Sequence, residues 1–107
     1  MREIEIRREE LFSKAAKELI GALNAELLIL YPEPGATHFR LDSDEVKGGN
    51  GAFLVAYVRG RPVGCGAIRR IDAQTAELKR MYVAPDVRGQ GVGYRLLEAL
   101  EGKARDI

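Results

Sequence analysis

The sequence has few of the residues that hold metals or disulfides. Its 107 residues include one cysteine, Cys65, one histidine, His38, and no tryptophan. A single cysteine excludes an internal disulfide framework and any site built from several cysteines, and it favours a reducing, cytoplasmic setting. We therefore expect no metal cofactor.

Long apolar runs and an excess of one charge are also missing. The longest apolar stretches, 27–30 and 52–58, are far shorter than the roughly 20 residues of a membrane-spanning helix, and the charged amino terminus has no secretory signal. The 17 basic and 16 acidic residues leave a net charge of +1. No global field therefore favours nucleic acid or an anionic membrane as partner.

What is present is typical of one soluble globular domain over residues 1–107, with 46% apolar and 31% charged residues. Residues 3–7 alternate charged and apolar, which predicts a half-buried strand. Apolar residues recur every three or four positions from 10 to 30, which predicts a helix with a kink or break at Gly21. Two prolines in 31–35 end it.

A polar loop over 36–51 separates this helix from the second half of the chain. Three apolar runs separated by short turns then predict an antiparallel meander of strands over 52–58, 63–71 and 76–83. Apolar residues at helical spacing from 91 to 105 predict the last helix. The expected fold class is α+β, in the order strand, helix, loop, three strands, helix.

The most informative segment is the glycine-rich turn between the last strand and the last helix, Arg88-Gly89-Gln90-Gly91-Val92-Gly93. Unpaired amides and the positive dipole end of a helix bind phosphate oxygens, and glycines let the backbone approach an anion. Arg88 adds a charged donor at the rim. A pyrophosphate suits this turn, and the alternative is a connection that only turns the chain.

Two better-known phosphate loops fit poorly. A Walker loop needs lysine and serine or threonine after its glycines, whereas Tyr94 and Arg95 follow Gly93. A dinucleotide-binding fold needs another strand with an acidic residue roughly 20 residues onward, and the sequence ends first.

The spacing of Arg88, Gly91 and Gly93, preceded by Met81-Tyr-Val-Ala-Pro85, resembles the pyrophosphate signature of the GNAT N-acetyltransferase superfamily. The resemblance implies acetyl-CoA as co-substrate. It implies that Met81, Tyr82 and Val83 face the pantetheine arm and acetyl group. The residues that it assigns to the diphosphate are Arg88, Gly89, Gln90, Gly91, Val92, Gly93 and Tyr94.

Acetyl transfer to an amine needs a proton acceptor and a donor to the developing oxyanion. A strand amide near Met81–Val83 meets the second need. For the first, Glu77 matches the general-base glutamate of histone-acetylating relatives. The alternative is a strand-end carboxylate paired with Lys79 or Arg69 across the hairpin.

Other residues each have a functional and a structural interpretation. Cys65 is either acylated or a small buried side chain, and His38 is either a base or a solvated loop residue. An acidic cluster either attracts a cationic amine or is solvated, and consists of Asp42, Asp44 and Glu45. Tyr31 either lines the acceptor pocket or packs at the helix end.

The resemblance also implies that part of the usual fold is missing, because the family continues with a strand, a helix and a hairpin. We expect the amino-terminal part of a GNAT-like mixed sheet, with the exposed edge of 76–83 either covered in a homodimer or belonging to a shortened form of a longer protein. The expected function is acetyl transfer from acetyl-CoA to a primary amine by direct attack in a ternary complex. The alternatives are a catalytically silent CoA-binding module and a purely structural α+β domain.

Overall fold

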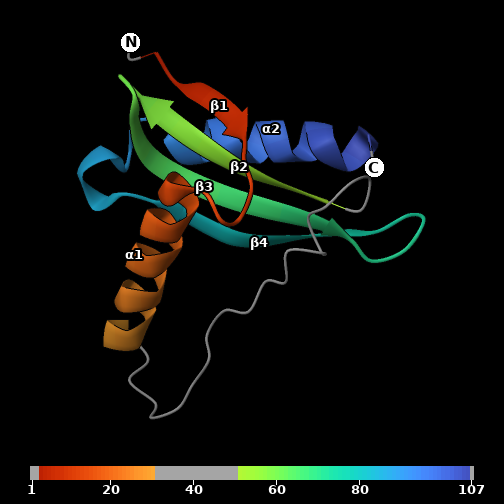
Figure 1. The fold of residues 1–107 in the computed structure, drawn as a ribbon. Coiled ribbons are helices and arrows are strands. Elements are labelled where there is room, and N and C mark those ends of the chain that lie inside the picture. The colour runs from red at the N-terminus through yellow and green to blue at the C-terminus, as the bar shows by residue number, and fades with distance from the viewer. Residues whose placement is uncertain (1–2, 31–50, 107) are drawn as a thin grey trace.

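A computed structural model describes residues 3–30 and 51–106. Its elements, in chain order, are β1 (Glu5–Arg8), α1 (Lys14–Leu30), β2 (Gly51–Val58), β3 (Arg61–Arg70), β4 (Ala76–Val83), the short 3₁₀ helix η2 (Pro85–Val87) and α2 (Val92–Asp106) (Figure 1). The expected α+β order is confirmed, with element ends that differ by a few residues. The predicted loop lies almost wholly outside the described residues.

The four strands form one antiparallel sheet in the order β1-β2-β3-β4. The turn between β2 and β3 consists of Arg59 and Gly60, whose φ angles of 52° and 78° are both left-handed, as a two-residue hairpin turn requires. Within the described ranges β4 pairs only with β3, so its outer edge has no strand beside it.

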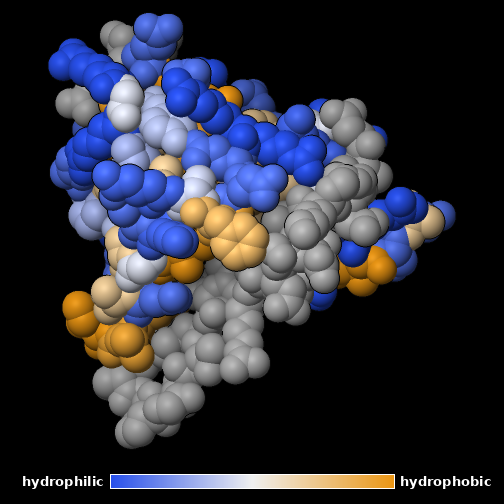
Figure 2. Space-filling model, viewed as in Figure 1, coloured by the Kyte–Doolittle hydropathy of each residue, from blue (hydrophilic) through white to orange (hydrophobic). Residues whose placement is uncertain are grey.

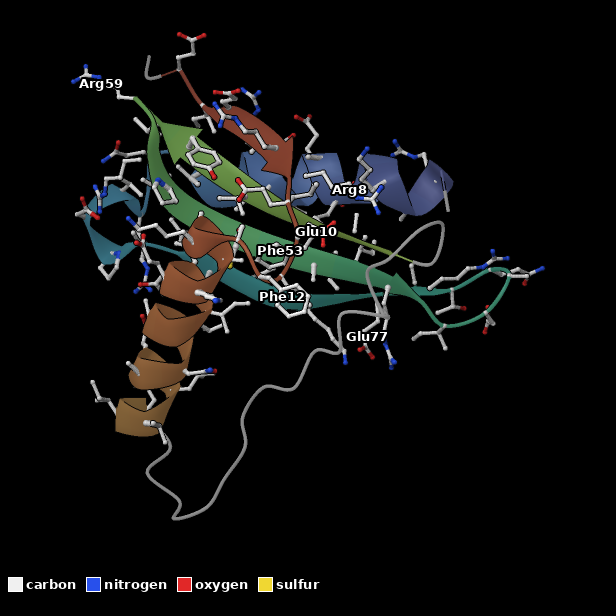
Figure 3. All side chains as sticks on the ribbon, viewed as in Figure 1. Arg8, Glu10, Phe12, Phe53, Arg59 and Glu77 are labelled. Atoms are coloured by element: carbon white, nitrogen blue, oxygen red, sulfur yellow. The ribbon has the colours of Figure 1, made fainter. Side chains whose placement is uncertain are left out.

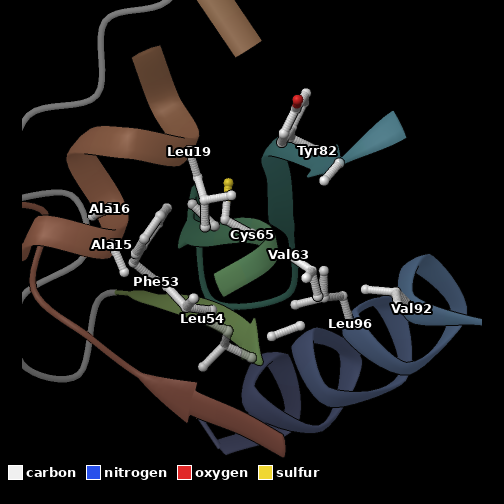
Figure 4. Close-up of a cluster of buried hydrophobic side chains, with 14 of the residues drawn as sticks. Ala15, Ala16, Leu19, Phe53, Leu54, Val63, Cys65, Tyr82, Val92 and Leu96 are labelled. Atoms are coloured by element: carbon white, nitrogen blue, oxygen red, sulfur yellow. The ribbon is translucent and has the colours of Figure 1, made fainter. Parts of the chain in front are cut away.

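The two helices lie on opposite faces of the sheet, with α1 in front of the strands and α2 behind them in Figure 1. Helix α1 packs on β3 and β4, and α2 packs on all four strands. Figure 4 shows Leu19 and Phe53 toward α1, and Leu54 and Leu96 toward α2. The core therefore has a buried apolar layer on each side of the sheet.

Helix α1 begins later than its apolar pattern suggests because Ser13 caps it. The Ser13 hydroxyl accepts a 3.0 Å hydrogen bond from the Ala16 amide, which satisfies one of the unpaired donors of the first turn. The helix continues through Gly21, so the expectation of a break there was wrong. A Cβ atom at Gly21 would meet nothing within 4 Å, so no close packing contact requires a glycine at this position.

Two glycines in β3 let α2 approach the sheet closely. A Cβ at Gly64 would lie 3.0 Å from both Leu96 Cδ1 and the Tyr82 carbonyl, and one at Gly66 would lie 2.6 Å from both Leu100 Cδ1 and Met81 Sδ. Glycine inside a strand often marks such a close approach. The contact places the first turn of α2 beside the end of β4.

Candidate functional site

The segment that leaves β4 is held by contacts to the β2–β3 hairpin. The Ala84 amide donates a 2.8 Å hydrogen bond to the Val63 carbonyl, and Val87 is 1% exposed. Asp86 accepts two hydrogen bonds from the Arg61 guanidinium, at 2.6 and 2.9 Å. Such a two-pronged pair fixes direction as well as distance, so η2 is oriented before any ligand binds.

The glycine turn that follows is open to solvent. Gly89 and Gly91 have φ angles of 82° and 87°, which other residues rarely adopt, and a Cβ at either would meet nothing within 4 Å. The Arg95 amide donates to the Gly91 carbonyl at 3.0 Å and closes the first turn of α2. The amides of Val92, Gly93 and Tyr94 precede that bond, so they have no acceptor one helical turn back. This geometry fits an anion such as a diphosphate.

The Arg88 side chain extends from this turn toward α1. Its Nε donates to the Val83 carbonyl at 2.8 Å, and its Nη2 lies 2.7 Å from Glu26 Oε2. Its guanidinium carbon is 5.7 Å from the centre of the Tyr82 ring. Arg88 therefore connects the end of β4 with α1.

A β-bulge interrupts β4 at the residues predicted to face the pantetheine arm. Cys65 is paired with Tyr82, but Ala67 is paired with Lys79, so Arg80 and Met81 together oppose Gly66. Lys79 and Tyr82 consequently lie on the same face although they are three residues apart. The bulge also changes the direction of the strand's backbone amides and carbonyls near Met81, Tyr82 and Val83.

Glu77 lies near the other end of β4 from the glycine turn (Figure 3). Its Oε1 is 3.5 Å from Arg69 Nε and 3.4 Å from Lys79 Nζ. The structure thus contains both ion pairs of the structural interpretation. Glu77 is paired with Arg69, and Met81 lies opposite Gly66, three positions along β3, so the two are about 10 Å apart at the usual rise. A base at Glu77 therefore needs water or a long acceptor to reach the acetyl group.

The remaining candidates divide between the core and the undescribed segment. Cys65 is buried, with 0% exposure, which agrees with its interpretation as a core residue. The other candidates lie outside the described residues: Tyr31, His38, Asp42, Asp44 and Glu45. Over 3–30 and 51–106, no three His, Cys, Asp or Glu residues come together as metal ligands would. Neither α1 nor α2 has the length and apolar character of a bilayer-spanning helix.

Glu26 and Asp86 are site residues that the sequence did not single out. Asp86 stands inside the recognised motif, but its partner Arg61 is 25 residues away. Glu26 is one of the two carboxylates of its helix, with Glu18, and it is 62 residues from Arg88. No local pattern distinguishes a partnered carboxylate from a solvated one.

A model of the Acetyltransferase (GNAT) family matches residues 11–107. The chain belongs to this family. The matched residues include β4, the glycine turn and α2.

Individual relatives agree with this assignment. An "IAA acetyltransferase" of Azospirillum brasilense is 40% identical in an alignment of 107 positions, which covers 98% of this GNAT chain and 68% of that protein. A structure from Klebsiella pneumoniae, described as a candidate acyl-CoA N-acyltransferase, is 32% identical with a TM-score of 0.74, covering 95% of this chain and 63% of that one. This chain therefore spans about two thirds of the length of these relatives.

A more distant structure shows the same fold. The GNAT acetyltransferase of Elizabethkingia anophelis, solved with acetyl-CoA bound, is 24% identical with a TM-score of 0.63. The match covers 95% of this chain and 57% of that protein.

Proposed function

We propose that this GNAT chain binds acetyl-CoA and supports transfer of its acetyl group to a primary amine by direct attack in a ternary complex. One observation carries the proposal. The first turn of α2 begins beside the end of β4, and the open glycines Gly89 and Gly91 stand in front of it. Family membership makes acetyl-CoA the ligand that fits an anion site in this position.

The coenzyme is assigned to the backbone of two consecutive segments. The diphosphate lies on the turn and first helical residues, from Arg88 to Tyr94, where the amides of Val92, Gly93 and Tyr94 have no acceptor one turn back. The pantetheine arm follows the bulged end of β4, at Met81, Tyr82 and Val83, where amides and carbonyls are redirected. When bound, acetyl-CoA supplies a thioester carbonyl that an amine can attack.

The residues of β4 then perform the remaining tasks. A bulge amide near Met81–Val83 donates to the carbonyl oxygen as negative charge develops on it. Glu77 receives, through water, the proton that the substrate ammonium group must lose before its nitrogen attacks, because the carboxylate lies on the Lys79 and Tyr82 side of the strand but about 10 Å from Met81. The tetrahedral intermediate then expels coenzyme A as its thiolate, which takes up a proton from water.

A catalytically silent coenzyme-binding module is the second candidate. The Glu77 carboxylate lies within 3.5 Å of both Arg69 and Lys79, so an ion-pair role alone accounts for its position. In that case the glycine turn still binds coenzyme A, but no base serves the amine.

Two measurements separate these candidates from each other and from a purely structural domain. Titration calorimetry with coenzyme A at low salt should show one site per chain, and absence of heat would leave only the structural domain. A thiol-release assay with acetyl-CoA and a panel of primary amines should show turnover. Binding without turnover on any amine would favour the silent module.

We also propose that the outer edge of β4 pairs with a second copy of the chain. Leu78 and Met81 are 42% and 37% exposed on this strand, which has no neighbour on that side within the described part of the chain. An edge with apolar side chains and unpaired backbone groups favours such pairing.

A further inference from the structure

The two halves of α1 differ in how they are held. In the first half, the buried residues that pack on the sheet are Ala15, Ala16, Leu19 and Leu23. In the last turn, Leu28, Ile29 and Leu30 are 50%, 79% and 61% exposed. Figure 2 shows a hydrophobic patch on the surface at the lower end of α1. Apolar packing on the sheet therefore holds the beginning of α1 much more firmly than its end.

One polar contact holds the second half. Over the described ranges, the ion pair from Glu26 to Arg88 is the single side-chain hydrogen bond or ion pair that joins residues 24–30 to another element. Glu26 Oε2 lies 2.7 Å from Arg88 Nη2, and the two side chains are 35% and 46% exposed. Leu27, partly buried against the core, is the adjacent apolar contact.

Arg88 is itself fixed at its other side. Its Nε donates to the Val83 carbonyl at 2.8 Å, and the guanidinium stands over the Tyr82 ring. Tyr82 pairs with Cys65, whose side chain Figure 4 shows on the α1 side beside Leu19. The Arg88 guanidinium is therefore on the α1 side of the sheet, whereas the amides of α2 belong to the helix on the opposite side.

We propose that Glu26 and Arg88 are a pair of positioning residues, which holds the second half of α1 beside the end of β4. The Arg88 side chain serves this purpose rather than binding the coenzyme diphosphate, which is left to the backbone of the turn. The effect of the pair on catalysis rests on the proposed function, but its role in holding the second half of α1 beside β4 does not.

The pair matters for the acceptor amine because of where that amine must approach. Glu77, Lys79 and Tyr82 share one face of β4, and this is the face that α1 covers. An amine that uses Glu77 as its base therefore lies on the α1 side. Releasing Glu26 would let residues 24–30 move and would enlarge or deform the space beside Tyr82 and Val83.

The test compares Glu26→Gln, Arg88→Gln and the double variant with Glu18→Gln, an exposed carboxylate of the same helix, as matched control. Hydrogen–deuterium exchange of the full chain should become faster in residues 24–30 by about two- to fivefold, the range expected for one exposed pair. Residues 14–23 should not change. Exchange of residues 24–30 in the double variant should be no faster than in either single variant, because each substitution removes the same interaction.

Calorimetry with coenzyme A at two salt concentrations tests the second half of the proposal. Arg88→Gln should change the dissociation constant by less than about twofold and leave its salt dependence unchanged, because no phosphate contact is lost. In Glu26→Gln and in Arg88→Gln, assayed with the amine that the unaltered chain turns over fastest, the KM for the amine should rise while kcat stays nearly constant.

Two results would overturn the proposal. One is unchanged exchange of residues 24–30 in Glu26→Gln. The other is a large, salt-dependent loss of coenzyme affinity in Arg88→Gln with none in Glu26→Gln, which would make Arg88 a phosphate ligand. If the unaltered chain binds no coenzyme A, the proposed function fails, and the exchange experiment still decides the role of the pair.

Discussion

Leu100 Cδ1 of α2 lies 2.6 Å from the position that a Cβ atom would occupy at Gly66 of β3. Met81 Sδ stands at the same distance on the bulged strand. Gly66 of β3 is therefore the point at which α2, β3 and β4 come together. Its missing side chain sets how closely α2 approaches β4.

Replacing Gly66 with alanine should destabilise the protein. The added methyl group must displace Leu100, which is fully buried, or turn Met81 outward, and overpacking of this kind costs about 1–3 kcal/mol. Denaturant unfolding measures the change. Gly21→Ala is the control, because its Cβ meets nothing within 4 Å in an exposed helix and it should gain about 0.5–1 kcal/mol. Equal stability of the two variants would contradict this account of Gly66.

Gly91→Glu should reduce coenzyme A affinity at least tenfold. The carboxylate would stand in the open space in front of the α2 amides and repel a diphosphate, and the φ of 87° adds backbone strain. Calorimetry should show a smaller loss of affinity for Gly91→Ala, which adds the backbone strain and a methyl group but no charge. Gly21→Glu adds the same charge far from the turn and should bind normally. Unchanged affinity in Gly91→Glu would mean that the site is elsewhere.

Glu77→Gln should lower turnover by about 10²-fold or more and displace the pH profile of kcat/KM, if this carboxylate accepts the proton. The thiol-release assay measures both. Glu5→Gln is the matched control, because Glu5 also pairs with an arginine, Arg7, at 2.8 Å on β1. An unchanged pH profile in Glu77→Gln would exclude Glu77 as the proton acceptor, and its role would then be limited to the ion pairs with Arg69 and Lys79.

Stability should decrease at high pH because of Tyr57. Burial, and secondly the hydrogen bond that its hydroxyl donates to Glu9, raise the pKa of Tyr57 from 10.0 to about 12. The unfolded chain releases this proton first, so stability is fully present below pH 10 and is lost as pH rises toward about 12. Tyr57→Phe should be less stable at pH 8 and should lose stability less steeply above pH 10. Parallel curves would exclude this linkage.

Light scattering should find a dimer if the β4 edges pair. Leu78→Lys places a charge on this strand and should shift the mass to that of a monomer, because charged side chains prevent edge pairing. Leu28→Lys, at a leucine that is also exposed but lies on α1, should leave the dimer intact. A monomeric unaltered chain at micromolar concentration would contradict the pairing.

The sequence by itself determined the order of the elements and the position of the glycine turn. Helical and strand patterns depend on which neighbours in the chain are apolar, and these are local properties. The glycines at 89 and 91 predicted an anion site because their conformational freedom is a property of the residue alone. That information sufficed for the α+β order and for the family.

Only the tertiary structure decided what the charged residues contact. Arg88 was expected at the rim of a phosphate site, yet its side chain lies between Val83 and Glu26, a residue 62 positions earlier. The bulge in β4 depends likewise on register with β3, and so does the approach of Arg69 to Glu77. Long polar side chains reach several partners from one backbone position, so the packing of helices and strands selects the partner.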